Sequence, residues 1–291
     1  MSTYTPLNYG ALLAEKNVLL AAPAGELMQT ISNTLREQGA AVYCVEKNGR
    51  DDDRLPCGCM VRGRLADEVI ADTIIQEVLQ QAGSIDSIVF CADPVFLAKS
   101  EALSGAAASA FYENNWLALH NLVSHALPAM KRQCCGTLVA VTSDYAVSAV
   151  PGVSVYSSVM AAMNAYVRSV GMECCKFDIR GNSVMAGFNI GANGDVFEAA
   201  LGKETAQDAF RRYQVLPRQG SCQDVANSVL FCASPLSNSI NGESFPVNGG
   251  ALVIGHSNVW NPKDKPVYST WGEHDKKDAA FSNAVGKEET K

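Results

Sequence analysis

Short apolar runs alternate with longer amphipathic segments over most of this chain. Residues 18–22 form the first apolar run, and the segment 26–38 repeats leucine or isoleucine every four residues, as one face of a helix requires. Gly39 is typical of the position just after a helix, and a second apolar run at 41–45 leads to Glu46. This pattern predicts a β-α-β unit at the start of the chain.

The alternation continues to about residue 250. Further helices are expected at 67–81, 107–131, 156–175 and 222–233, and further strands at 88–91, 137–141, 182–186 and 244–247. Apolar strands that alternate with helices indicate a sheet covered on both faces. The sequence therefore predicts an α/β fold, a Rossmann-like doubly wound parallel sheet in a single domain.

The last segment of the chain has a different composition. Residues 253–291 contain Trp260, Tyr268 and Trp271, followed by a polar end rich in Lys, Glu and Asp. We interpret residues 1–252 as the Rossmann-like domain and the rest as a C-terminal extension that is partly disordered. Aromatic side chains are typical anchors of interfaces, so we expect the aromatic half of the extension to pack on a neighbouring subunit.

Composition and charge exclude several classes of function. The chain has 291 residues, of which 47% are hydrophobic, and this is ample for one buried core. Its 30 acidic and 23 basic residues give a net charge of -7, which disfavours nucleic acid and anionic membranes as partners. The sequence contains no apolar run of about 18 residues and no signal-peptide pattern, so we expect a cytoplasmic protein.

The ten cysteines favour reduced thiols rather than disulfides, because the chain is long and has no secretion signal. Cys57-Gly-Cys59 and the doublets at 134–135 and 174–175 lack the two-residue gap of a zinc or iron–sulfur knuckle. We therefore expect no metal site.

Several motifs carry a family resemblance. Asn115 lies thirteen residues before Pro128 in a helix that ends Ala-Leu-Pro-Ala-Met-Lys, and Ser143 lies thirteen residues before Tyr156. Residues 179–187 read Ile-Arg-Gly-Asn-Ser-Val-Met-Ala-Gly, similar to a strand and loop that normally end in Pro-Gly.

Two further segments, 224–234 and 240–250, are similar to a closing helix and a closing strand of the same family. Together with the element order, these motifs resemble the short-chain dehydrogenase/reductase family over roughly residues 16–252. The resemblance implies the doubly wound fold, a nicotinamide cofactor and a Ser-Tyr-Lys catalytic set assisted by Asn.

The first turn departs from the family's pattern. In the family this turn reads Thr-Gly-x-x-x-Gly-x-Gly, and its glycines let the backbone approach the cofactor's pyrophosphate. Here the aligned glycine positions are Ala22, Glu26 and Met28. Met28 adds bulk where the backbone should approach the cofactor, and Glu26 places a carboxylate where the phosphate should bind. Two like unit charges about 4 Å apart repel each other by roughly 4 kcal/mol at an effective dielectric constant of about 20.

Other cofactor positions are degenerate as well. The family's Asn-Asn-Ala-Gly is replaced by residues 90–93, which end in Asp93, and the aspartate that contacts adenine aligns with Gly63. Glu46 resembles a ribose-binding acid, but an acidic residue that ends a strand is commonplace. We therefore expect this chain to bind no nicotinamide cofactor.

The catalytic set is only partly present. Asn115, Ser143 and Tyr156 match the family's positions, whereas the lysine position is Met160. An ordinary tyrosine titrates near pH 10, so without a cation it is a poor base at neutral pH. We interpret the three residues as a relic set, although a buried Ser and Tyr can also persist because their hydrogen bonds satisfy the backbone.

The pattern of losses most resembles the cofactor-free subunit of heteromeric hydroxyacyl-CoA dehydrogenases. Family members assemble through the helices that correspond to 107–131 and 156–175 and through the last strand, and these segments keep their pattern here. We therefore expect a non-catalytic subunit that stabilises an active homologous subunit, in a heterotetramer with NAD on the partner.

Two alternatives remain open. The chain could be a cofactor-independent enzyme of the same fold, similar to the halohydrin dehalogenases, which would use Ser143 and Tyr156; Met160 counts against it because those enzymes place Arg there. It could also be a ligand-sensing module that uses the vacated pocket. The loop around 188–215 forms the family's substrate pocket, but its start at 191–194 indicates only flexibility.

Overall fold

Alternating strands and helices build the chain as the hydrophobic pattern predicts. The computed structural model describes residues 9–48, 59–148, 150–188, 190–207, 216 and 218–253. The strands are β1 (Asn17–Ala22), β2 (Ala41–Glu46), β3 (Cys59–Arg62), β4 (Ser87–Cys91), β5 (Gly136–Ser143), β6 (Ile179–Ala186) and β7 (Ser244–Val247). The α-helices are α1 (Glu26–Glu37), α2 (Glu68–Ala82), α3 (Gly105–Tyr112), α4 (Ala118–Gln133), α5 (Ser154–Cys174), α6 (Ala192–Leu201) and α8 (Cys222–Ala233).

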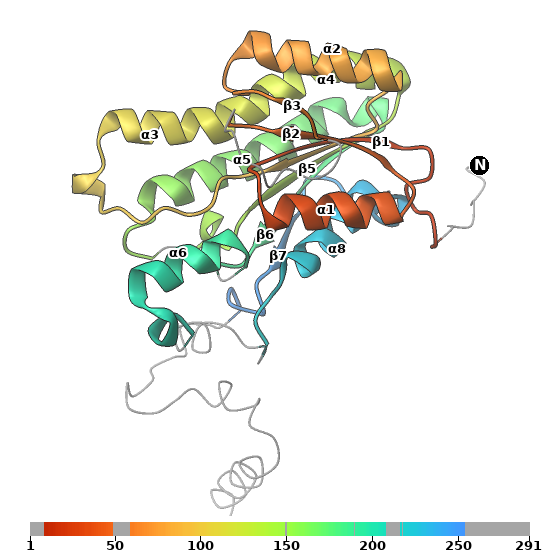
Figure 1. Ribbon diagram of the computed structural model, residues 1–291. Helices are drawn as coiled ribbons and strands as arrows, with labels where there is room; N and C mark the ends of the chain where they lie inside the picture. Colours follow the sequence, from red (N-terminus) through yellow and green to blue (C-terminus); the bar gives the residue numbers. More distant parts are fainter. Residues whose placement is uncertain are drawn as a thin grey trace, which may run out of the picture.

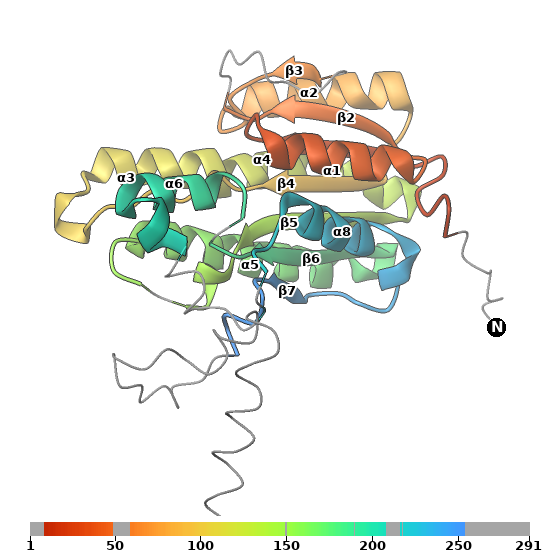
Figure 2. The ribbon, with the colours of Figure 1, turned by 60° about the horizontal axis from the view of Figure 1, so that its bottom comes forward.

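The seven strands form one parallel sheet in the order β3-β2-β1-β4-β5-β6-β7. Figure 2 shows them from β3 at the top to β7 at the bottom. The strands that follow β1 in sequence are added first on one side and then, from β4 onward, on the other. This reversal between β1 and β4 is a topological switch point, and it confirms the expected doubly wound fold.

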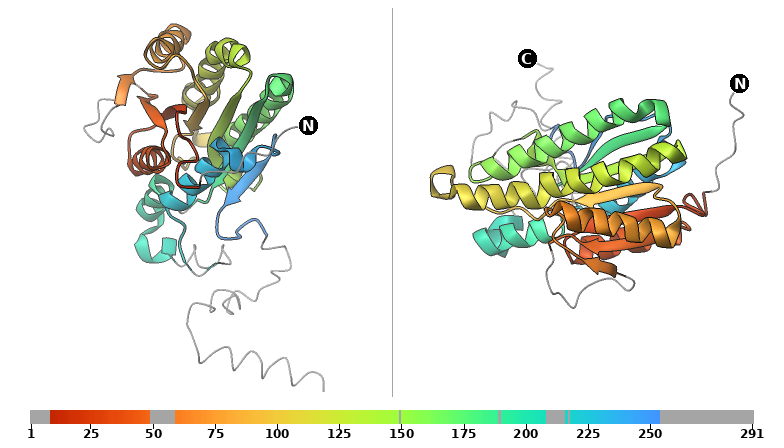
Figure 3. Two further views of the ribbon diagram at one scale, coloured as in Figure 1. Left: turned by 90° about the vertical axis from the view of Figure 1, so that its right-hand side faces the viewer. Right: turned by 90° about the horizontal axis from the view of Figure 1, so that it is seen from above.

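Helices cover both faces of the sheet. Buried side chains of α2, α4 and α5 form one core cluster, and those of α1 and α8 form the other (Figure 3, left). β4 is buried at all five positions, as a central strand covered on both faces must be. Among the described residues, none of the helices is long and apolar enough to cross a membrane.

The single helix expected at 107–131 is interrupted. A turn of π-helix, η2 (Glu113–Leu117), separates α3 from α4. Within it the Asn115 side chain donates from Nδ2 to the Phe111 carbonyl oxygen at 2.8 Å. This side-chain bond to a carbonyl one turn earlier satisfies a backbone group of the irregular turn.

Two elements were not expected from the sequence. β3 adds a strand at the sheet edge, and α6 lies in a segment that we interpreted as a loop. Gly191 precedes α6 with φ at 56°, a left-handed conformation that favours glycine. The glycines at the start of α6 therefore led us to interpret a helical segment as a loop. The expected extension with Trp260, Tyr268 and Trp271 lies outside the described residues.

Candidate functional site

A cavity of about 400 Å³ lies at the switch point between β1 and β4. Its wall is formed by the turn after β1, the loop after β4, Tyr156 of α5 and the start of α6. In folds of this type the carboxyl ends of the strands at a switch point form the ligand-binding crevice. Five of the expected positions line this cavity: Ala22, Glu26, Met28, Asp93 and Tyr156.

The turn between β1 and α1 keeps one glycine. Gly25 precedes the helix with φ at 152° and ψ at -172°, and a Cβ there would meet nothing within 4 Å. Glu26 begins the helix and is exposed at the cavity. We expected Met28 to add bulk to the crevice; its side chain is 0% exposed and packs mainly into the core with Ile31 and Leu35, although it also borders the cavity.

Carboxylates surround the N-terminal end of α1. Glu26 is hydrogen-bonded to the Cys222 thiol, and Asp195 of α6 lies on the same side of the cavity. Burial, together with the carboxylates of Glu26 and Asp195, raises the pKa of Cys222 to about 11. The helix N-terminus, which would attract an anion in the usual member of this fold, therefore faces negative side chains.

Lys47 is a buried cation that the sequence analysis missed. Its side chain is 0% exposed and forms an ion pair with Asp93 at 3.0 Å. The ammonium donates to the Asn114 carbonyl oxygen at 2.7 Å and to Asn115 Oδ1 at 3.3 Å, and it lies 5.2 Å from the centre of the Phe90 ring. Burial lowers the pKa of Lys47, and Asp93 opposes this shift. Two features of the sequence could have indicated this ion pair. Lys47 directly follows a predicted strand, and the charged Asp93 stands in place of the family's glycine.

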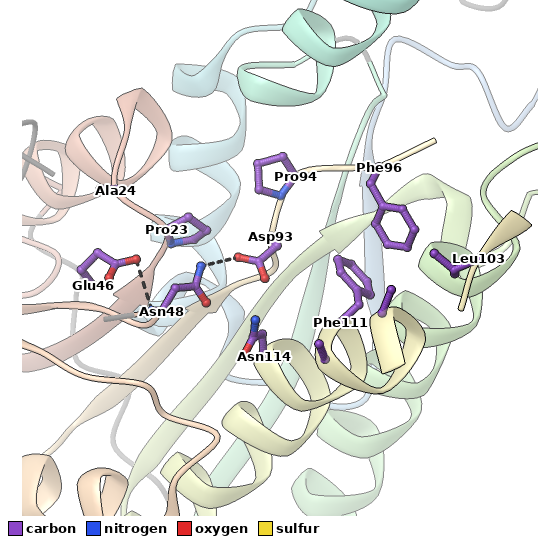
Figure 4. A pocket seen from close by; sticks show the side chains of 12 residues that line it. Pro23, Ala24, Glu46, Asn48, Asp93, Pro94, Phe96, Leu103, Phe111 and Asn114 are labelled. Atoms are coloured by element: carbon purple, nitrogen blue, oxygen red, sulfur yellow. Dashed lines mark hydrogen bonds between the residues drawn. The ribbon is translucent and has the colours of Figure 1, made fainter. Parts of the chain in front are cut away.

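Asp93 connects this cation to the relic asparagine. Its backbone N–H donates to Asn115 Oδ1 at 2.7 Å, and its Oδ2 accepts from Asn115 Nδ2 at 3.1 Å. Asn48 Nδ2 donates to Asp93 Oδ1 at 2.8 Å, as Figure 4 shows. The Asn115 side chain is therefore fully engaged by Lys47, Asp93 and Phe111.

The Lys47–Asp93 ion pair spans the end of β1. Lys47 follows β2 and Asp93 follows β4, and β1 lies between these two strands in the sheet. The Lys47 backbone N–H also donates to the Ala22 carbonyl oxygen, at 3.3 Å. In a dinucleotide-binding member of this fold, the cofactor crosses the same strand end.

The structure brings Ser143 and Tyr156 together. The Tyr156 side chain is 1% exposed and is hydrogen-bonded to the side chains of Ser143 and Asn193. Burial raises the pKa of Tyr156 above its ordinary value, although these hydrogen bonds lower it in part. Met160 is 0% exposed and belongs to the core. The position of the family's lysine therefore holds an uncharged side chain that packs in the core.

Asn193 closes the cavity from the side of α6. Its Oδ1 accepts from the Val95 backbone N–H at 2.7 Å, and it is also bonded to Tyr156. The side chain thus ties the start of α6 to the loop after β4. This contact corrects our interpretation of residues 191–194 as a flexible loop start without chemical meaning.

Asp144 is a second titratable group beside the relic pair. It is 2% exposed and accepts from Ser143 Oγ at 3.3 Å and from Asn248 Nδ2 at 3.2 Å. Burial raises its pKa to about 6, against the opposing effect of the hydrogen bonds from Asn248 and Ser143. The sequence analysis did not single out this residue, because acidic residues after strands are common.

The remaining expected positions, Glu46 and Gly63, lie at the ends of β2 and β3. Glu46 is 1% exposed and accepts from the Asn48 backbone N–H at 3.2 Å. Gly63 donates to the Glu46 carbonyl oxygen, and a Cβ at Gly63 would lie 2.5 Å from Ile70 Cγ2. An aspartate at Gly63 would therefore displace Ile70. No group of three potential metal ligands gathers within the part of the chain that the structure describes.

These residues match a nicotinamide dinucleotide poorly. Glu26 and Asp195 place negative charge where a pyrophosphate would bind, and the Lys47–Asp93 pair lies across the path of the adenosine half.

The chain is similar to known oxidoreductases. A family model described as Enoyl-(Acyl carrier protein) reductase matches residues 28–251, so the match begins at Met28, the last of the three positions that lack the family's glycines. The 3-oxoacyl-[acyl-carrier-protein] reductase FabG of Staphylococcus aureus (strain N315) is 26% identical over 248 residues, which cover 83% of this chain and 91% of the relative.

The peroxisomal 2,4-dienoyl-CoA reductase [(3E)-enoyl-CoA-producing] of Mus musculus is 27% identical over 181 residues, 62% of this chain and 61% of the relative. Among solved structures, a gluconate 5-dehydrogenase from Burkholderia cenocepacia J2315 in complex with NADP and tartrate superposes with a TM-score of 0.76. That alignment covers 84% of this chain and 97% of the other at 17% identity, and it shows a shared fold.

Proposed function

Because the chain belongs to the short-chain dehydrogenase/reductase family, we propose that it is the non-catalytic subunit of a heteromeric, NAD-dependent dehydrogenase of this family. In this proposal it binds no nicotinamide cofactor itself and stabilises an active homologous subunit that carries NAD. The complex is a heterotetramer of two inactive and two active chains that works in the cytoplasm, without nucleic acid or membrane as a partner.

The state of Tyr156 carries the proposal. A family tyrosine acts as acid or base because a neighbouring lysine lowers its pKa, but here that position is the buried Met160. Burial instead raises the pKa of Tyr156, with the carboxylates of Asp144 and Asp93 contributing in the same direction. A tyrosine in these surroundings stays protonated at neutral pH, which supports a subunit without hydride-transfer chemistry of its own.

The outer face of the long helices supports a role in assembly. Trp116 of η2 stacks on Tyr112 at 5.2 Å and on His120 at 5.5 Å between ring centroids, and Tyr166 of α5 contacts Trp116 edge-on at 5.6 Å. Tyr112 is 41% exposed and the other three are half-buried. Figure 3 (right) shows α4 and α5 side by side on this face. Partly exposed aromatic side chains are enriched at interfaces, so this face is our candidate contact with the partner.

The substrate class is proposed from the relatives and from the pattern of losses. Two relatives act, by their names, on thioesters of acyl carrier protein or coenzyme A. We propose that the complex oxidises a hydroxyacyl-CoA, as in the 2-[hydroxy(phenyl)methyl]succinyl-CoA dehydrogenase of anaerobic toluene degradation, which this chain's pattern of losses resembles. The active partner would supply every reacting group.

Native mass spectrometry of the protein purified from its own cells tests the proposal. We expect a heterotetramer whose second chain carries the glycine-rich turn and Tyr-x-x-x-Lys, and we expect activity from the mixed chains but not from this chain alone. Calorimetric titration with NAD and NADP should detect no binding to this chain, and Met160→Lys alone should restore no turnover. A homotetramer without a homologous partner, or a partner that is fully active and stable alone, would overturn the proposal.

Asp144 favours a second candidate, a cofactor-independent enzyme of the same fold. A carboxyl group with a pKa of about 6 beside Ser143 Oγ has the properties of a general base. Against this candidate, Ser143 and Asp144 are at most 2% exposed and do not line the cavity that Tyr156 borders. Turnover of a substrate by the isolated chain, abolished by Asp144→Asn, would establish it in place of the subunit function.

A further inference from the structure

The helix α6, at the lower left in Figure 1, turns one of its faces toward the relic catalytic residues. Asn193 and Phe197 are four residues apart, so they lie on the same side of the helix. Phe197 is buried and Asn193 is half-buried, whereas Asp195 and Ala199 are exposed. The helix therefore meets the rest of the domain through the face that carries Asn193 and Phe197.

The polar group on this face binds the relic tyrosine. The Asn193 side chain is hydrogen-bonded to Tyr156, which is also hydrogen-bonded to Ser143. Asn193 Oδ1 accepts from the Val95 N–H at 2.7 Å, so the amide is fixed between α5 and the loop after β4. A group that exchanges a proton with a tyrosine must lie within hydrogen-bonding distance of its hydroxyl. Asn193 already holds such a position.

The apolar group on the same face packs among buried rings. The centroid of the Phe197 ring lies 5.5 Å from that of Phe188 and 6.3 Å from that of Tyr145. The Tyr145 ring in turn lies 6.4 Å from the Tyr156 ring. Aromatic pairs attract each other at centroid separations of about 4.5–7 Å, and each of these four side chains is at most 9% exposed. Phe197 therefore fills a space beside the relic tyrosine that is lined with aromatic side chains.

The rings around Phe197 come from separate parts of the chain. Tyr145 belongs to a short 3₁₀ helix after β5, η3 (Asp144–Ala146), and Phe188 follows β6. Because β5 and β6 are neighbouring parallel strands, their carboxyl ends lie together. Folds of this type bind their ligands outside the carboxyl ends of the strands. α6 thus brings an amide and a phenyl ring of the chain itself to a place where a ligand would be expected.

We propose that α6 is an intramolecular pseudosubstrate. Asn193 takes the hydrogen-bonding position of a substrate's reacting group at Tyr156, and Phe197 takes the place of the substrate's apolar body against Tyr145 and Phe188. This inference rests on the non-catalytic function proposed above and deepens it, because it adds a block that does not depend on the cofactor. A chain with a restored cofactor site would hold no substrate at Tyr156 until α6 is displaced.

A ligand that carries both groups tests the proposal on the full-length chain. The ketone 4-phenylbutan-2-one joins a phenyl ring to a carbonyl group over about the distance between side chains one helical turn apart. Asn193→Ala combined with Phe197→Ala removes both of the chain's own groups. By saturation-transfer NMR titration we expect a Kd on the order of 1 mM in this double variant, and binding at least about tenfold weaker in the wild type. Adding Tyr156→Phe should weaken binding to the double variant about tenfold, the equivalent of one hydrogen bond.

Phe177→Ala is the control for the loss of a phenyl ring elsewhere. Phe177 is half-buried and precedes β6, at the opposite edge of the sheet, so this variant should bind the ketone no better than the wild type does. Equal binding to the wild type and the double variant would overturn the proposal. Binding to the double variant that Tyr156→Phe leaves unchanged would also overturn it, because Asn193 and Phe197 would then be ordinary packing groups.

A milder variant and an independent measurement keep the test decisive. If near-ultraviolet circular dichroism shows that the double variant has lost its packing, Asn193→Ala with Phe197→Leu keeps most of the buried volume, and we expect the same order of affinities. A heterotetramer in native mass spectrometry together with no binding of the ketone to either variant would overturn this inference and leave the subunit function standing. Binding of the ketone as expected by a chain without a homologous partner would do the reverse.

Discussion

The carboxyl edge of the sheet around β1, β2 and β4 differs sharply from the packing around β6 and β7. At the first region charged side chains bind one another, as Lys47 binds Asp93 across the end of β1. At the second region polar side chains bind backbone, as Asn241 does when its Oδ1 accepts from the Gly181 N–H at 2.9 Å and its Nδ2 donates to the Gly171 carbonyl oxygen at 3.1 Å. Interactions with backbone hold strands and helices in place in any protein of this fold. The charged pair instead occupies a position that the fold usually leaves to a ligand.

The buried arginine of β6 follows the second pattern. Arg180 is 8% exposed and donates to Ser237 Oγ at 2.9 Å and to the carbonyl oxygens of Ile240, Cys232 and Ser234. Its charge is spread over acceptors that belong to the fold itself. The comparison indicates that Lys47 and Asp93 stabilise the crevice in place of a bound molecule, and the following experiments test it in order of expected effect.

Removing the cation should have the largest effect. Lys47→Met keeps the length of the side chain but leaves Asp93 and the Asn114 carbonyl oxygen without their partner. We expect the free energy of unfolding to fall by about 3–5 kcal/mol, measured by urea denaturation. Adding Asp93→Asn should recover part of this loss, because the unpaired charge is then gone. A loss below about 1 kcal/mol in Lys47→Met would mean that the pair does not hold the crevice together.

Asp144 provides a pH-dependent test. Its folded-state pKa of about 6 is higher than the ordinary value of 3.8, so the folded state binds more protons than the unfolded state between these values. The contribution of this group to stability is therefore full below about pH 4 and is lost as the pH rises to 6, by about 3 kcal/mol. Asp144→Asn should remove this dependence, so that its stability relative to the wild type rises with pH.

Urea denaturation between pH 4 and 7 measures this difference, and the exposed Asp195→Asn provides the control. A constant difference between Asp144→Asn and the wild type over that range would show that Asp144 is not a high-pKa group.

Close packing in the second region should be the next most sensitive feature. A Cβ at Gly181 would collide with the Val167 carbonyl oxygen of α5, so Gly181→Ala forces helix and strand apart. We expect a loss of about 1–3 kcal/mol in the free energy of unfolding. Gly105→Ala is the control, because a Cβ there meets nothing within 4 Å. Equal stability of the two variants would contradict the close approach of α5 to β6.

The smallest effect concerns the start of α8. Ser221 and Asp224 form a capping box, in which Ser221 Oγ accepts from the Asp224 N–H at 3.3 Å and Asp224 Oδ2 accepts from the Ser221 N–H at 2.9 Å. Ser221→Ala should lower the melting temperature by an amount that corresponds to about 1 kcal/mol. Ser169→Ala, on the exposed face of α5, should leave it unchanged. An equally stable Ser221→Ala would show that α8 does not depend on its cap.

The sequence by itself determined the order of the elements and the chemical losses. The helix expected at 222–233 and the strand at 244–247 have these bounds in the structure, because a capping serine and short apolar runs mark them locally. The absence of glycine at Ala22 and of lysine at Met160 was equally visible, since a fixed spacing from recognisable motifs places both positions. Such signals need only neighbours along the chain.

Only the tertiary structure decided how the crevice is filled. Lys47 and Asp93 follow strands that are separated by β1, so their ion pair exists only once the parallel sheet has formed. Asn193 lies in a glycine-rich stretch that we interpreted as a loop from the sequence. The structure has a helix there, and Asn193 contacts Val95 and Tyr156. Hydrophobic periodicity reports which face of an element is buried, but it carries no information on which distant polar group will lie opposite. The pairing of strands far apart in sequence supplies that information, and the Lys47–Asp93 ion pair depends on it.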